Sequence, residues 1–197
     1  MNTVTTNTII LAVVLIVIAV AAVGWAFTQR QRRSQRLQRR FGPEYGRTVQ
    51  ELGGQTKAEA ELKKREDRVA RLKITTLSTA DAARFAEAWN SLQGRFIDNP
   101  KGVVGEADRL VREVMVKRGY PMGDFERRAA DISVDHPDVV ATYRSAQVIA
   151  ARDARGEADT EELRRAVVYY RTLFDELLEV SPARPVDARE TRTPVHS

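Results

Sequence analysis

Residues 9–27 read IILAVVLIVIAVAAVGWAF, and residues 28–40, which follow directly, read TQRQRRSQRLQRR. The first stretch holds eighteen apolar residues and Gly24, and no residue before Arg30 has a charged side chain. A helix of this length reaches about 28 Å, which is close to the hydrocarbon thickness of a bilayer. We therefore expect a transmembrane helix over residues 9–27, preceded by a short extracytoplasmic segment, residues 1–8.

Two other interpretations of this apolar run stay open. A cleaved signal peptide has a basic segment before a shorter apolar run, whereas residues 1–8 contain no Lys or Arg. The triplet Ala19-Val20-Ala21 would be its cleavage site. A buried core helix of a soluble protein would show a polar face, which residues 9–27 lack. The length of the run and its lack of charge favour the membrane span.

Six arginines with no acid among them follow the apolar run. They are Arg30, Arg32, Arg33, Arg36, Arg39 and Arg40. Basic flanks of membrane helices stay in the cytoplasm, so we expect a single-pass protein with its N-terminus outside and its C-terminal domain cytoplasmic. Anionic lipid headgroups attract each nearby basic residue by about 1 kcal/mol. The six arginines are therefore candidates both for setting the topology and for contacting lipid headgroups.

The formal net charge of +5 is unevenly distributed along the chain. Residues 28–40 carry +6, residues 41–74 carry +2, residues 75–180 carry −4 and residues 181–197 carry +1. Nucleic-acid binding requires a basic face on the folded unit, so this distribution argues against a nucleic-acid partner. The chain has no cysteine and two histidines, which excludes thiolate and multi-histidine metal sites.

The stretch between the span and residue 75 contains two predicted segments. Residues 28–54 are expected to be a basic juxtamembrane segment ending in a hinge, because glycine and proline interrupt the chain between Phe41 and Gly54. Residues 55–74 predict a highly charged, solvated spacer helix supported by i,i+4 ion pairs. Its thin apolar seam of Leu62, Val69 and Leu72 leaves open self-association as a coiled coil.

Residues 75–180 predict an antiparallel bundle of about three to four helices, which makes the fold class all-α. Phe85, Trp89, Leu92 and Phe96 follow one another at spacings of 4, 3 and 4, which places them on one apolar helix face. Loops of two to six residues favour antiparallel neighbours, and no alternating strand pattern is present. Residues 181–197 hold three prolines and show no apolar periodicity, which predicts a disordered tail.

The ends of the bundle helices are predicted from capping and helix-breaking residues. Starts are expected at Ser78, Asn99, Asp124, Asp135-His136-Pro137 and Thr160, and stops at Gly119 and Gly156. The last helix should then carry its apolar residues at Leu163, Val167, Tyr170, Phe174 and Leu177.

The tetrapeptide Arg118-Gly119-Tyr120-Pro121 has two interpretations. It is a candidate recognition turn in which Arg118 and Tyr120 are presented, with His136 as a further candidate residue. The favoured interpretation is helix termination, with Tyr120 packed back on its own helix, because glycine and proline already have that local role.

The acids around His136 suggest a metal site at first sight. Asp131, Asp135 and Asp138 lie close to it in the sequence. However, acids before a helix N-terminus compensate the helix dipole. A single histidine without a second defined ligand group is also a weak metal site. We therefore expect no bound metal.

Other chemistry-bearing patterns are weak as well. Gly102-Val103-Val104-Gly105 lies inside a predicted helix and not after a strand, so it does not predict a phosphate-binding loop. Phe85, Trp89 and Phe96 would fit an aromatic ligand pocket, but their helical spacing favours core packing. No catalytic constellation is evident, so we expect neither enzymatic activity nor a cofactor.

A string of motifs runs through residues 89–144. They are Trp89, Gln93, Arg95-Phe96-Ile97-Asp98-Asn99-Pro100, Ala107-Asp108, Arg118-Gly119-Tyr120-Pro121, Phe125-Glu126, His136-Pro137 and Tyr143-Arg144. Together they resemble a family of small uncharacterised bacterial proteins over about residues 41–180. The resemblance implies an N-terminal membrane segment, a helical C-terminal region and a bacterial plasma membrane location, and it implies no catalytic residues.

Three functions are compatible with these patterns. The first is a membrane-anchored cytoplasmic interaction module that binds a protein, whose surface should be basic or mixed because the bundle is mildly acidic. The second is a structural role at the membrane surface, through self-association over residues 57–73 into a homo-oligomer and through anionic-lipid contact. The third is a ligand sensor or enzyme, which requires a pocket of about 300 Å³ or more between the bundle helices.

Overall fold

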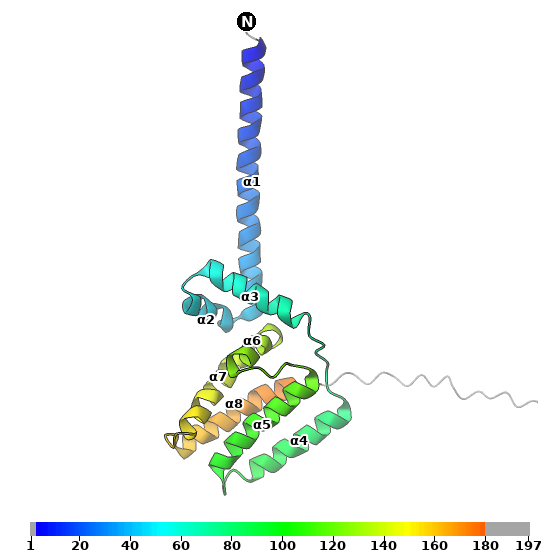
Figure 1. The fold of residues 1–197 in the computed structure, drawn as a ribbon, viewed down its shortest axis with the longest axis vertical. Helices are drawn as coiled ribbons and strands as arrows, with labels where there is room; N and C mark the ends of the chain where they lie inside the picture. Colours follow the sequence, from blue (N-terminus) through cyan, green and yellow to red (C-terminus); the bar gives the residue numbers. More distant parts are fainter. Residues whose placement is uncertain (1–2, 180–197) are drawn as a thin grey trace, which may run out of the picture. The chain divides into compact units, whose positions relative to one another are not determined.

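The computed structural model describes residues 3–179. For residues 3–14 and residue 19 it describes the backbone alone. Within these residues the chain forms eight helices and no strand, which confirms the all-α class (Figure 1). They fall into two compact units. The first contains the residues up to Ala70 and Ser133–Asp138, and the second contains Arg71–Ile132 and the residues from Val139 on. The predicted tail, residues 181–197, lies outside the described residues.

The first unit is built on one long helix. Helix α1 runs without interruption over Thr3–Phe41, and α2 (Pro43–Leu52) and α3 (Gln55–Val69) pack against its last turns. Leu37 and Phe41 of α1 are buried there together with Leu62 of α3. The described large apolar side chains between Leu15 and Phe27 are instead 58% to 70% exposed.

The predicted hinge between Phe41 and Gly54 is wrong in its middle, where α2 lies. Gly42, with φ 46°, and Gly53, with φ 67°, form the turns on either side of this helix. Both turns need positive φ, which glycine adopts without steric cost. Pro43 takes the first helical position, where its missing N–H is not needed. Glycine and proline therefore mark the ends of a short helix and not a loop.

The predicted helix over residues 55–74 is confirmed as far as Val69, but its prediction as a solvated spacer is wrong. Helix α3 begins at Gln55 as expected, but it ends at Val69 and buries Leu62 and Val69 within the first unit. The seam expected to mediate self-association is therefore covered at these two positions by the chain itself. Sequence reasoning missed this because most of the buried residues of α3 are small or charged, and such residues normally predict a solvent-exposed face.

The second unit is the predicted helical bundle. It contains α4 (Thr79–Gly94), α5 (Pro100–Arg118), most of α6 (Phe125–Asp135) and α7 (Pro137–Asp153), and α8 (Thr160–Leu177). Its core confirms the predicted apolar face of α4, since Phe85, Trp89 and Leu92 are buried. The Trp89 ring stacks on Phe174 of α8 with 4.6 Å between ring centroids. Trp89 therefore packs in the core and does not line an aromatic ligand pocket.

In the second unit α4 and α5 are antiparallel, and so are α7 and α8, as their short loops predict. Lys117 Nζ, at the end of α5, lies 3.1 Å from Asp81 at the start of α4. Tyr170 of α8 donates to Gln147 of α7. Helices α5 and α8, which are distant in the sequence, run parallel and form the most extensive helix pair (Figure 1). The longer connection through α6 permits this parallel arrangement.

Side-chain caps confirm most of the predicted helix starts. Ser78 accepts a hydrogen bond from the backbone N–H of Asp81, and Asn99 accepts one from that of Gly102. The predicted cap at Thr160 is wrong by one residue. Asp159 caps α8 in a reciprocal capping box with Glu162, because the Asp-x-x-Glu spacing satisfies two backbone donors at once.

Gly119 offers a test of the turn that ends α5. Its φ is 96°, and a Cβ atom there would lie 2.5 Å from the backbone oxygen of Lys73. We expect Gly119→Ala to lower the free energy of unfolding by about 1–3 kcal/mol, since both the backbone conformation and the space are unfavourable. Urea unfolding followed by Trp89 fluorescence, in a Trp25→Phe background, measures the change.

The matched control for Gly119 is Gly105, in the same helix. A Cβ atom at Gly105 would meet nothing within 4 Å, so Gly105→Ala should stabilise the helix by about 0.5–1 kcal/mol. Equal effects of the two substitutions would contradict the role assigned to Gly119.

Candidate functional site

The arginines that follow the apolar run of α1 form a basic surface, which we call the arginine collar (Arg30, Arg32, Arg33, Arg36, Arg39 and Arg40). Three of them contact the described chain. Arg36 lies 2.9 Å from a carboxylate oxygen of Glu66, and Arg40 lies 3.4 Å from the other. Arg30 donates to the hydroxyl of Thr56 at 2.7 Å. Half of the collar therefore also holds α3 against α1.

Glu66 is the acidic centre of this contact. Its side chain is only 6% exposed, and Lys63 approaches it to 3.5 Å in addition to Arg36 and Arg40. A buried carboxylate requires such partners, because an unpaired buried charge is costly. Lys63 also pairs with Asp67 at 2.8 Å and Arg40 with Asp135 at 3.9 Å, so the three cations around Glu66 belong to a larger network of ion pairs.

Arg32 and Arg39 make no ion pair with any side chain in the described part of the chain. They line a shallow hollow of about 470 Å³ together with Gln35, Arg36 and Arg40. A second hollow, of about 400 Å³, shares Arg32 and Arg36 and extends to Lys63 and Glu66. Guanidinium groups bind phosphate through paired hydrogen bonds. The collar therefore has the chemistry of an anion-binding surface.

A hydrogen-bond network lies beneath the collar. Tyr45 donates to the Glu59 carboxylate at 3.0 Å, Gln55 donates to the same oxygen at 2.8 Å, and Gln55 also donates to Ser34. Burial raises the pKa of Glu59, but hydrogen bonds from Gln55, Ser34 and Tyr45 lower it, and the net pKa lies below the ordinary value. Glu59 is therefore ionised at neutral pH.

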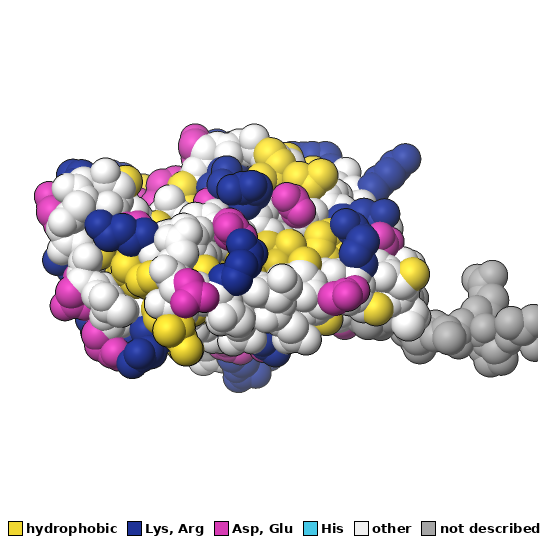
Figure 2. Space-filling view, turned by 90° about the horizontal axis from the view of Figure 1, so that it is seen from below, with side chains coloured by type: hydrophobic (Ala, Val, Ile, Leu, Met, Phe, Trp, Pro, Cys, Tyr) yellow, Lys and Arg dark blue, Asp and Glu magenta, His cyan; other side chains and the backbone are white. Residues whose placement is uncertain are grey.

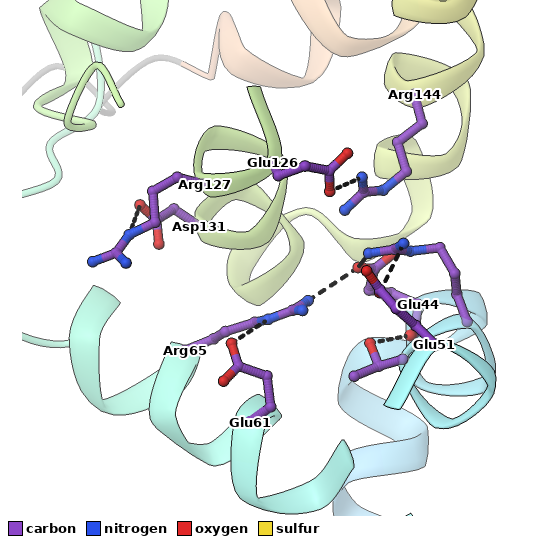
Figure 3. Close-up of polar contacts among 10 residues, drawn as sticks. Glu44, Glu51, Glu61, Arg65, Glu126, Arg127, Asp131 and Arg144 are labelled. Atoms are coloured by element: carbon purple, nitrogen blue, oxygen red, sulfur yellow. Dashed lines mark hydrogen bonds and ion pairs between the residues drawn. The ribbon is translucent and has the colours of Figure 1, made fainter. Parts of the chain in front are cut away.

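A second buried charge group joins α2 to α3 (Figure 3). Arg65 lies 3.0 Å from Glu44 and 3.4 Å from Glu61, and Arg47 forms a further pair with Glu44 at 2.9 Å. Arg65 and Glu44 are both buried. No apolar pattern in the sequence indicates this contact, because it depends on opposite charges brought together by the turn at Gly53 and Gly54.

The candidate recognition turn is not presented at the surface. Tyr120 is 3% exposed and belongs to the core of the second unit. Arg118 is also buried, and it donates to the backbone oxygens of Thr75 and Leu177, each at 3.2 Å. The favoured interpretation of this turn as a helix stop is confirmed, and Arg118 has a structural role that the sequence did not indicate.

His136 is likewise buried, in the Ser133–Asp138 stretch of the first unit. Asp135 lies 3.9 Å from Arg40 in that unit. In the second unit, Asp131 pairs with Arg127, and Glu126 pairs with Arg144 at 2.6 Å (Figure 3). Among the described residues no group of three or more His, Asp or Glu side chains is arranged to hold a metal ion.

Within the described residues, no helix combines the length and the apolar character that a bilayer span requires. The predicted span over residues 9–27 lies partly outside this set, because the side chains of residues 9–14 and 19 are not described.

Comparison of the chain with models of protein families, with curated proteins and with solved structures returns no match. The resemblance of residues 41–180 to a bacterial family therefore stays a prediction.

Arg65 offers a test of the buried charge pairs. Arg65→Ala removes one cation from the buried Glu44 carboxylate, and we expect the free energy of opening of α2 and α3 to fall by about 3 kcal/mol. Hydrogen exchange of the full chain, read by mass spectrometry on peptides from α2 and α3, measures this change. The control is Arg164→Ala, which breaks an exposed pair with Glu161 and should change stability by less than about 0.5 kcal/mol. Unchanged hydrogen exchange in α2 and α3 would contradict a stabilising role of the Arg65–Glu44 pair.

Proposed function

We propose that the chain is a membrane-anchored helical interaction module of a bacterial plasma membrane. In this proposal residues 9–27 of α1 cross the bilayer with the N-terminus outside. The arginine collar contacts anionic headgroups of the cytoplasmic leaflet. The helical bundle of the second unit lies in the cytoplasm and binds a protein partner. The bacterial location rests on the resemblance of residues 41–180.

The observation that carries the membrane part of the proposal is the exposure of apolar side chains on α1. Eight described large apolar residues from Leu15 to Phe27 are at least 58% exposed. Leu15, Ile16, Val17 and Ile18 are consecutive, so they point to all sides of the helix. Apolar surface of this extent favours burial in another apolar medium. A continuous helix also satisfies its own backbone hydrogen bonds, as hydrocarbon requires.

The position of the arginine collar supports the proposed orientation. Arg30 follows Phe27 by three residues, which is about 4.5 Å along a helix axis. Arg32 and Arg33 follow within about 9 Å, at the depth of lipid headgroups when residues 9–27 fill the hydrocarbon. Arg32 and Arg39 have no ion pair within the described chain, so their charges are available to phosphate. Basic residues at this place retain the flank in the cytoplasm.

The surface of the second unit supports a binding role. Its largest aromatic residues fill its own core, while Ile97, Val116, Met122, Val148 and Val168 are between 43% and 90% exposed. Figure 2 shows apolar side chains lying among Lys, Arg, Asp and Glu side chains on the visible face. Mixed apolar and charged surface is typical of non-obligate protein interfaces. Self-association through the α3 seam is less favoured, because Leu62 and Val69 are buried within the first unit.

Reporter fusions test the anchor and its orientation. In a bacterial host, a cytoplasm-sensing reporter at the C-terminus of the full chain should be active, and an export-sensing one should not. Val17→Arg together with Val20→Arg should release the chain from carbonate-washed membranes, since each centrally placed arginine costs about 2.5–3.5 kcal/mol on insertion. An export signal from the C-terminus, or a mature chain shortened at its N-terminus, would overturn the proposal.

The arginine collar has a separate test. We expect Arg32→Gln together with Arg39→Gln to weaken binding of fluorescent phosphatidylglycerol to the full chain in non-ionic detergent by about 30-fold. This follows from about 1 kcal/mol per arginine. The matched control is Arg164→Gln together with Arg165→Gln on α8, which removes the same charge and should leave binding within about twofold. An equal loss in both double variants would show that net charge alone determines binding.

A further inference from the structure

The second unit carries a groove along its α4–α5 helix pair that none of the features above explains. Two hollows lie there, of about 610 Å³ and about 250 Å³. Arg109 and Glu113 of α5 line both of them, so the two hollows adjoin along α5, and we call them together the α4–α5 groove. From Glu106 to Lys117, the part of α5 that lines the groove is about 16 Å long, or about three helical turns.

The larger hollow has an apolar floor that water reaches. Val116 is 56% exposed and Met122 is 43% exposed, although both are apolar. Phe85, also in the lining, is buried. An exposed valine and methionine beside a buried phenylalanine offer an anchoring place for an apolar side chain, and methionine adapts its shape readily.

The rim of this hollow is basic. Arg84, Arg109, Arg112 and Lys117 line it, with Glu113 as the single acid. Arg84 and Lys117 share Asp81 as a partner, at 3.7 Å and 3.1 Å, and Arg112 pairs with Asp108 at 2.7 Å. No ion pair is present for Arg109 within the described part of the chain. Arg109 is also the one of these four cations that lines both hollows.

We propose that the α4–α5 groove is the docking site for an acidic amphipathic helix of a partner protein. This inference rests on the proposed protein-binding function and names the chemistry of the partner. A helix lying in a groove uses apolar anchors at spacings of three and four residues. The floor at Val116 and Met122 would take these anchors. Acidic side chains on either side of them would meet Arg109, Arg84 and Lys117.

The direction of the charge complementarity is opposite to the one expected from composition. Residues 75–180 carry a net charge of −4, which by itself favours a basic or mixed partner. The lining of its larger hollow has four basic side chains and one acidic one. Asp81 and Asp108 pair with three of these cations, which leaves Arg109 without an ion pair among the described residues. A partner interacts with the charges within about a Debye length, about 8 Å at physiological ionic strength, and not with the net charge of the unit.

Peptide binding to the full chain in non-ionic detergent tests the proposal. The probe is a fluorescein-labelled 18-residue helical peptide with Leu on one face at i, i+3, i+4 and i+7 and Glu on both flanks. A second peptide has Lys in place of every Glu. By fluorescence anisotropy, the Glu peptide should bind at least about tenfold more tightly than the Lys peptide. Equal binding of the two peptides, or none, would overturn the proposal.

Matched substitutions locate the binding. Arg109→Glu should weaken binding of the Glu peptide by about tenfold or more, and Val116→Ser should weaken it by about fivefold. The controls lie on α8. Arg165 is likewise an exposed arginine, and Val168 is as exposed as Val116, at 56%. Arg165→Glu and Val168→Ser should change affinity by less than about twofold. Equal losses in the α4–α5 and α8 variants would overturn the assignment of the groove.

Other occupants of the groove would give different results, and each would overturn the proposal. If residues 181–197 cover it, a chain without them should bind the Glu peptide at least about fivefold more tightly. If a second copy covers it, sedimentation should show a dimer that Val116→Ser abolishes and Val168→Ser leaves. If an anionic membrane covers it, phosphatidylglycerol vesicles should displace the bound peptide while neutral vesicles should not.

The outcome is independent of the membrane anchor. Because binding is measured in detergent, it does not require residues 9–27 to cross a bilayer. If the peptide binds but the anchor test fails, the docking site is supported and the membrane location is overturned. If the anchor test succeeds but the peptide does not bind, the membrane location is supported and the docking site is overturned.

Discussion

The buried carboxylate of Glu66 is the interaction on which the first unit depends. Arg36 and Arg40 reach it from α1, and Lys63 reaches it from within α3. Few large apolar side chains are buried in this unit, so ion pairs help to hold α3 against α1, and Arg65 joins α3 to Glu44 of α2. Once buried, these charges require their partners, since an unpaired one would cost several kcal/mol. The same helix that exposes apolar residues from Leu15 to Phe27 thus ends in a folded, charge-paired unit.

Local charge and net charge differ at both candidate interaction surfaces. Half of the arginine collar is used inside the chain, by Glu66 and by Thr56, whereas Arg32 and Arg39 retain their charge for an external anion. In the second unit, a net acidic segment carries a basic groove between α4 and α5. Electrostatic interactions act over about a Debye length, so the arrangement of side chains decides which partner each surface favours.

Much of the second unit could be predicted because its signals are local. The spacing of Phe85, Trp89 and Leu92 predicted one buried face, and Ser78 and Asn99 predicted helix starts that the structure confirms. The arginine collar was also recognised, from the row of charges after an apolar run. The first unit could not be predicted in the same way. Its helices α2 and α3 are held by pairs such as Arg65–Glu44, which join residues 21 positions apart.

The sequence alone determined the helical class, most helix boundaries of the second unit and the abrupt change from apolar to basic residues after Phe27, since each depends on residues within one or two turns. Only the tertiary structure decided which charges are buried, which are free, and where the α4–α5 groove lies. Arg118 illustrates the difference: in the sequence it belongs to a conspicuous turn, but in the structure it binds the backbone of Thr75 and Leu177. Contacts between distant residues have no signature in local spacing, because they depend on how helices pack and not on how they form.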